Sequence, residues 1–88
     1  MNRTIWKYQL RLGPGPQEIQ MPGGAEVLHV AFQGETLRMW VQVYPDALID
    51  LRVFEVQPTG WAIEDVRHHV GTAMDGDAVW HVFEVFGQ

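Results

Sequence analysis

The stretch AEVLHVAFQGETLRMWVQVY, residues 25–44, decides the fold. Apolar and polar residues alternate on both sides of the dipeptide Gly34-Glu35, and glycine at the first central position is typical of a two-residue type II′ hairpin turn. Such a turn fixes the register of the two strands, so turn chemistry and apolar pattern agree on an antiparallel hairpin. The apolar residues then pair on one face, with Phe32 opposite Leu37, Val30 opposite Met39 and Leu28 opposite Val41.

Short β-rich runs separated by glycine and proline make up the rest of the chain, at residues 4–12, 17–21, 48–57 and 68–86. The last run predicts a second hairpin with a type I′ turn at Asp75-Gly76. Residues 61–68 allow at most one short helical turn. We therefore predict an all-β fold, a small antiparallel β-sandwich or barrel of about seven strands, as a single β domain over residues 1–88. The second turn sets Gly71 opposite Trp80 and Arg67 opposite Glu84.

The final segment DAVWHVFEVF, residues 77–86, is apolar at nearly every position and so has no clearly polar face. A strand of this kind needs cover on both sides. It is either central in a closed barrel or shared with a second copy of the chain. Because a short chain buries a limited share of its own surface, we expect a homodimer.

Composition excludes several classes of chemistry. Cysteine and serine are both absent, so the chain has no disulfide, no thiolate metal site and no serine or cysteine nucleophile. The formal net charge of −5 argues against binding to duplex nucleic acid. No apolar run has the length of a membrane span and the first residues lack the apolar core of a signal peptide, so we expect a cytoplasmic protein without membrane contact.

We expect neither an enzyme nor a metal or cofactor site. The adjacent His68 and His69 point to opposite faces of a strand and cannot easily converge on one ion. The carboxylates of Asp75 and Asp77 flank a turn glycine, where aspartate is favoured for conformational reasons. The glycine runs at 13–16 and 22–24 lack the lysine and helix of a phosphate-binding loop.

Candidate binding residues fall in two regions. Arg38 and Trp40 share the polar face of the first hairpin with His29, where cations beside aromatic rings could hold a nucleotide or single-stranded RNA, or form a subunit contact. Trp61 follows Gly60 beside charged residues and is either an interface anchor or a plug over one end of the barrel. The complete set of candidate binding residues is Arg38, Trp40, Arg52, Trp61, Glu64, Asp65 and Arg67.

The order of several segments resembles a known family. IWKYQL (5–10), IQMPGGAEVLHV (19–30), MWVQVYPD (39–46), PTGWAI (58–63), HVGTA (69–73) and WHVFEV (80–85) follow one another along nearly the whole chain. This pattern is similar to that of small uncharacterised proteins, a domain of unknown function, encoded by phages, prophages and bacteria. The resemblance implies a viral or mobile-element origin and a bacterial cytoplasmic setting, and it assigns no catalytic or binding residue.

Three functions follow as hypotheses. The first is a non-enzymatic phage- or prophage-encoded interaction protein that binds a host protein, such as a counter-defence protein of the kind that inhibits CRISPR systems. It predicts that the acidic turns lie on one side of the molecule, at Asp46, Asp50, Glu64, Asp65, Asp75 and Asp77. The alternative is a sponge-like binder of a nucleotide or other small ligand, with a site lined by residues such as Arg38, Trp40 and Arg52. The third is a virion structural or assembly protein.

Overall fold

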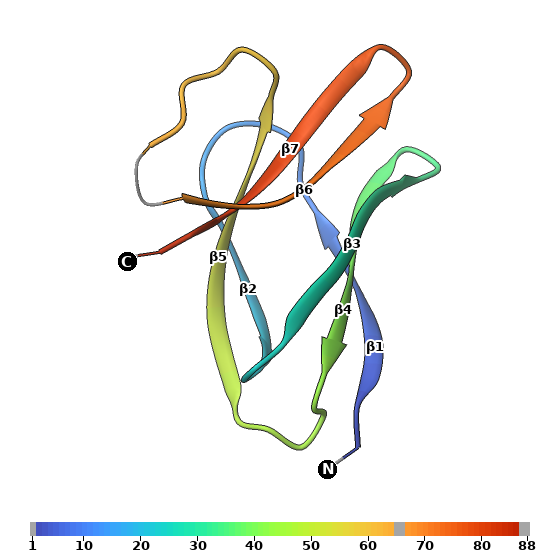
Figure 1. Cartoon of the computed structure of the whole chain (residues 1–88), viewed down its shortest axis with the longest axis vertical. Coiled ribbons are helices and arrows are strands. Elements are labelled where there is room, and N and C mark those ends of the chain that lie inside the picture. The colour runs from blue at the N-terminus through green and yellow to red at the C-terminus, as the bar shows by residue number, and fades with distance from the viewer. Residues whose placement is uncertain (1, 65–66, 87–88) are drawn as a thin grey trace.

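The computed structural model describes residues 2–64 and 67–86, which form seven antiparallel strands in two sheets (Figure 1). One sheet has three strands in the order β1-β4-β3, and the other has four in the order β2-β5-β7-β6. The predicted all-β sandwich is confirmed, in an open form, and the described residues contain no helix. The strands are β1 (Thr4–Leu10), β2 (Gln17–Pro22), β3 (Glu26–Gln33), β4 (Thr36–Val43), β5 (Ile49–Pro58), β6 (Arg67–Asp75) and β7 (Ala78–Val85).

The hydrophobic core lies between the two sheets. In β4 every second residue is buried, which is the period expected of a strand with one face on a core. These residues pack with the inward-facing side chains of β5 and β7, among them Phe54, Val56 and Val82, all fully buried. The alternation in residues 36–43 thus fixes which face of the three-stranded sheet is covered.

The β3–β4 hairpin confirms the predicted turn. Gly34 has a φ of 62°, whereas the φ of Glu35 is not positive, because among the described residues only glycines have a positive φ. A type II′ turn requires this combination, a positive φ at the first central residue only. The predicted pairs hold as far as His29. Beyond it the strand carries a β-bulge, so Val27 and not Leu28 lies opposite Val41, and the predicted Leu28–Val41 pair is wrong. The extra residue turns Leu28 outward, where it is exposed.

The turn of the β6–β7 hairpin lies one residue later than predicted. Asp75 pairs with Ala78, so the central residues are Gly76 and Asp77. Gly76 has a φ of 59°, whereas a type I′ turn at Asp75-Gly76 would force a positive φ on an aspartate. From Gly71 to Asp75 the register therefore differs by two residues from the predicted one, whereas a β-bulge between His69 and Gly71 reduces the difference to one residue at Arg67–His69. A slip of two residues keeps side chains on their face, so the apolar pattern next to the turn could not reveal it.

The predicted cross-strand pair of Gly71 with Trp80 is consequently wrong. Trp80 lies opposite Ala73, and Gly71 lies opposite Val82. Gly71 instead lets β6 approach β3, because a Cβ atom on Gly71 would come within 2.9 Å of Val30 Cγ2. The two sheets thus come into contact along one side of the sandwich, where β3 and β6 are neighbours without a shared ladder.

The final strand is covered on both faces within the chain. β7 is central in its sheet, between β5 and β6. Its inward face contributes Val82 to the core, and Phe83 on the outward face shares a small pocket with Trp61 and Ile63 from the segment that follows β5. The position of residues 77–86 is therefore explained without a second copy, and the homodimer stays a prediction.

The described connections between strands contain no helix, and their acidic residues do not gather on one side of the molecule. Residues 61–64 are irregular, and strand β6 begins at Arg67. The β4–β5 turn, with Asp46, and the β6–β7 turn, with Asp75 and Asp77, lie at opposite ends of the molecule (Figure 1). The predicted gathering of acidic turns on one side is therefore wrong. Within the described ranges, no helix is long and apolar enough to cross a membrane.

Candidate functional site

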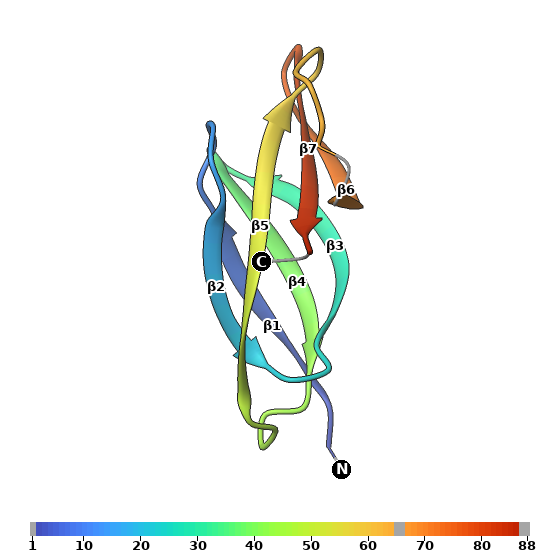
Figure 2. The same cartoon turned by 90° about the vertical axis from the view of Figure 1, so that its left-hand side faces the viewer.

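Strand β5 is longer than either of its neighbours in the sheet, and its pairing is staggered. Its first part, Ile49–Phe54, pairs with β2, whereas its second part, Val53–Pro58, pairs with β7 (Figure 2). β7 ends at Val85, which lies opposite Val53. Among the described residues, positions 49–52 therefore have a ladder partner on one side only.

The backbone groups of Ile49 and Leu51 face this open edge. Gly23 N donates to Leu48 O over 2.8 Å, which makes Gly23–Leu48 a hydrogen-bonded pair at the end of the β2–β5 ladder. Hydrogen-bonded pairs alternate in an antiparallel ladder, so residues 50, 52 and 54 bond to β2 and residues 49 and 51 point away from it. In agreement, Leu51 N donates to the side chain of Asp50, at 3.0 Å from Oδ1.

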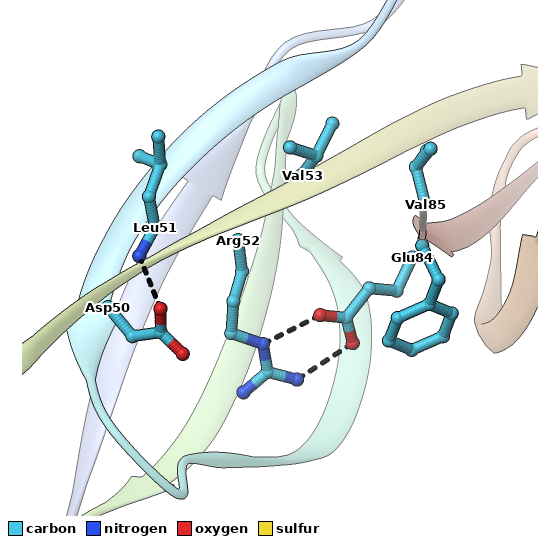
Figure 3. A pocket seen from close by; sticks show the side chains of 7 residues that line it. Asp50, Leu51, Arg52, Val53, Glu84 and Val85 are labelled. Atoms are coloured by element: carbon cyan, nitrogen blue, oxygen red, sulfur yellow. Dashed lines mark hydrogen bonds and ion pairs between the residues drawn. The ribbon is translucent and has the colours of Figure 1, made fainter. Parts of the chain in front are cut away.

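A bidentate ion pair between Arg52 and Glu84 lies beside the open edge. Arg52 Nε and Nη2 each donate to one carboxylate oxygen of Glu84 over 2.7 Å, and Arg52 Nη1 donates to the carbonyl oxygen of Ala25 (Figure 3). The hydrogen bonds to Glu84 raise the pKa of the Arg52 guanidinium. This pair joins the end of β7 to β5 and to the chain between β2 and β3.

We call the hollow at this edge the edge groove, and it has a volume of about 380 Å³. It has two chemically different sides. Leu51, Val53 and Val85 point to one side of β5, and Asp50, Arg52 and Glu84 point to the other (Figure 3). The groove is lined by Asp50, Leu51, Arg52, Val53, Glu84, Val85 and Phe86.

A second hollow of about 300 Å³ lies on the other side of the ion pair. It is lined by the chain after β2 and by the start of β6, and it adds the carboxylate of Glu26. The lining of the edge groove carries the carboxylates of Asp50 and Glu84 and the guanidinium of Arg52, which gives a net charge of −1, and Glu26 adds a further carboxylate in the second hollow. The charged side of the edge groove is therefore suited to a cation.

The predicted site residues do not gather in one place. Arg38 and Trp40 lie half-buried on the outer face of the three-stranded sheet, with Trp40 at 5.8 Å from the His29 ring. Arg52 belongs to the other sheet and points inward toward Glu84. Within one chain, the predicted ligand site of Arg38, Trp40 and Arg52 is therefore not formed.

Trp61 and Glu64 lie in the segment after β5, and both are exposed. Trp61 is half-exposed and lines a pocket of about 160 Å³ together with Ile63 and Phe83, so it covers the outer face of β7 in part. Asp65 lies outside the described residues. Near this segment, Arg67 Nη2 donates to Glu55 Oε1 over 2.7 Å.

The buried acid Glu84 therefore has a different partner from the predicted one. Arg67 lies opposite Val85 and pairs with Glu55, whereas Glu84 pairs with Arg52. The prediction named Arg52 but omitted Asp50, Leu51 and Glu84. The sequence did contain one indication that Glu84 has a cationic partner. Glu84 is the only charged residue in the apolar run 78–86, and a buried carboxylate needs a cation.

A chain of hydroxyl and imidazole groups crosses the outer face of the four-stranded sheet. Thr72 Oγ1 lies 2.9 Å from His69 Nε2 and 3.1 Å from His81 Nδ1, and the other nitrogen of His81 lies 2.8 Å from Thr59 Oγ1. These contacts occupy the threonine hydroxyls and join β6 to the end of β5. Among the described residues no carboxylate hydrogen-bonds to either histidine, so these contacts lack the third member that orients a catalytic base.

The comparison with known families covers the whole chain. The family described as Domain of unknown function (DUF7352) matches residues 1–88. The chain belongs to this family. No curated protein and no solved structure matches the chain.

Proposed function

We propose that this DUF7352 domain is a non-enzymatic interaction protein that binds another protein at the edge groove. One observation carries the proposal: within residues 2–64 and 67–86, the backbone of Ile49 and Leu51 has no strand partner at the open edge of β5, and the side chains of both residues are exposed. Leu51 is 51% exposed and Ile49 is 62% exposed. Unpaired strand edges with apolar neighbours are surfaces on which other chains dock.

In its finer form, the proposal is that a phage or prophage encodes the protein and that it acts in the cytoplasm of the bacterial host. The resemblance of its segments to small phage and prophage proteins supports this origin. The partner is then a host protein, and inhibition of a host defence system is the activity we expect. Restored phage plating on a host with an active defence system would test the counter-defence role.

The test of protein binding uses two matched variants. The tagged protein is purified from host cells, and bound proteins are quantified per molecule of the tagged chain. Leu51→Arg places a charge on the apolar side of the edge groove, and Leu28→Arg makes the same change at the β3 bulge, where leucine is 47% exposed. We expect a stoichiometric partner with the unaltered protein and with Leu28→Arg, and its loss with Leu51→Arg. Recovery of no stoichiometric partner with any of the three would contradict the proposal.

A further inference from the structure

We propose that the occupant of the edge groove is an extended segment of the partner protein, added to β5 as an antiparallel strand, with apolar and basic side chains in alternation. The inference rests on the proposed function and names the chemistry of the partner. It follows from three properties of the groove, which are the open backbone groups, the two unlike sides and the net charge.

The backbone groups at the open edge match two hydrogen-bonded pairs of an antiparallel ladder. Ile49 and Leu51 are two residues apart and point the same way, and in an antiparallel pair each such residue exchanges both N–H and C=O with its partner. An incoming strand would continue the line of β7 along β5. The Asp50 carboxylate accepts the Leu51 N–H at present, and because Asp50 is exposed, its side chain can turn away as the strand arrives.

The two sides of the groove select alternate side chains of the incoming strand. Side chains opposite Ile49 and Leu51 lie on the outer side of the sheet, next to Val53 and Val85, so apolar groups are favoured there. Side chains opposite Asp50 lie on the charged side. There Arg52 is held by both oxygens of Glu84, while neither Asp50 nor Glu26 takes part in an ion pair with another described residue. Lysine or arginine at these positions offsets the net charge of −1 that Asp50, Arg52 and Glu84 give to the lining of the edge groove.

A second copy of this chain fits the same edge poorly. The register that uses both open residues of both copies pairs Ile49 of one copy with Leu51 of the other, and this sets Asp50 opposite Asp50. Like charges directly opposite one another destabilise a strand pair. A register centred on Leu51 would instead require the edge of Val53, which already pairs with Val85. The groove therefore favours a different chain with the opposite charge.

Binding is tested with synthetic octapeptides of alternating lysine and valine, labelled for fluorescence anisotropy. A second peptide carries glutamate in place of lysine, and a third carries lysine with N-methyl groups on alternate amides that would donate to β5. We expect the lysine peptide to bind and to shift the amide resonances of Leu51 and Phe86. We expect the glutamate and N-methylated peptides to bind at least about tenfold more weakly.

Two protein variants separate the backbone of Leu51 from its side chain. Leu51→Pro removes the N–H that would enter the new ladder, and Leu51→Ala removes the same apolar side chain but keeps the N–H. Because this N–H bonds to Asp50 and not to β2, proline at this edge position is compatible with the strand. We expect Leu51→Pro to bind the lysine peptide about tenfold more weakly than Leu51→Ala. Asp50→Asn, which keeps the shape and removes the charge, should also weaken binding of the lysine peptide.

Each result has a defined meaning. Equal binding by Leu51→Pro and Leu51→Ala, or by the N-methylated and unmodified peptides, would overturn strand addition. Equal binding of the glutamate peptide would overturn the basic class. Concentration-dependent dimers that disappear in Leu51→Pro would identify a second copy as the occupant and overturn the inference. If Leu51→Pro does not fold, the N-methylated peptide still decides. A cellular partner lost with Leu51→Arg but retained with Leu51→Pro would leave protein binding intact and reject this mode of binding.

Discussion

Val30 Cγ2 lies 2.9 Å from the position that a Cβ atom on Gly71 would occupy. Val30 is buried in the core on β3, and Gly71 lies on β6 in the other sheet. The contact sets how closely the two sheets approach along this side of the sandwich. We expect Gly71→Ala to lower the free energy of unfolding by about 1–3 kcal/mol, because an added methyl group has no room in a packed interface. Urea denaturation measures the change.

The double variant Gly71→Ala, Val30→Ala checks the cause of this loss. Val30→Ala should itself destabilise the core, but it removes the atoms that the new Cβ atom meets. Gly71→Ala should therefore cost less in the Val30→Ala background than in the unaltered protein. Strictly additive losses would show that the two residues do not compete for the same space.

Loss of Arg52 should loosen the end of β7. We expect Arg52→Met to lower the free energy of unfolding by about 2 kcal/mol, because it leaves the Glu84 carboxylate buried without its cation. The cost is below that of a fully buried pair, since the Arg52 side chain keeps 20% of its exposure. Hydrogen exchange should accelerate at Val85 and Phe86. Lys7→Met, which removes a cation that bonds to Gln33 in the other sheet, is the control and should leave exchange at these two amides unchanged.

The side-chain amide of Gln17 connects the start of β2 to the chain after β1 through its oxygen and its nitrogen. Its Oε1 accepts from Arg11 N and its Nε2 donates to Arg11 O, each over 2.8 Å. Gln17→Glu keeps an acceptor but sets a carboxylate against the carbonyl oxygen of Arg11. We expect a loss of about 1–2 kcal/mol at neutral pH, with partial recovery in acid, where the protonated carboxyl can donate again. Thermal unfolding at several pH values measures both effects, and an equal loss at every pH would refute the explanation.

The stability of the protein should fall in alkali because of Tyr8. Burial raises the pKa of the Tyr8 phenol above its usual value of 10.0. The folded state therefore keeps the phenol proton at a pH where the unfolded chain releases it. The contribution to stability is complete below the unfolded pKa and is lost as the pH rises through the folded pKa. Tyr8→Phe should flatten the decline in unfolding free energy above about pH 10. An unchanged decline in Tyr8→Phe would assign it to other groups.

The sequence was sufficient for the strands and for one turn, because local rules decide both. Gly34 occupies the one central position of a type II′ turn that needs a positive φ. The position of the glycine therefore predicts the turn, and the turn predicts the register of the two strands. At residues 75–77, Asp-Gly and Gly-Asp are both acceptable turns, and next to the turn, from Gly71 to Asp75, the two registers place side chains on the same face. Neither composition nor periodicity separates them, and the structure selects Gly76-Asp77.

The candidate site was predicted less well, because it depends on contacts between distant segments. The edge groove exists because β7 stops at Val85 while β5 extends back to Ile49. Nothing in the alternation of either strand sets this difference in length. Arg52 was named as a candidate from its type alone, and its partner Glu84 lies 32 residues away in the chain. The β3 bulge at Leu28 was missed for a similar reason, since an apolar residue there fits either face.

The order of strands also has a consequence for how the chain reaches this structure. β3 with β4 and β6 with β7 are joined by tight turns, whereas β1 pairs with β4 and β2 pairs with β5 across long intervening segments. Closing long loops costs entropy before the distant contacts repay it. We therefore expect the two hairpins to form early and the N-terminal strands to dock late. During synthesis, β1 and β2 leave the ribosome before their partners β4 and β5, so they remain unpaired until those strands have emerged.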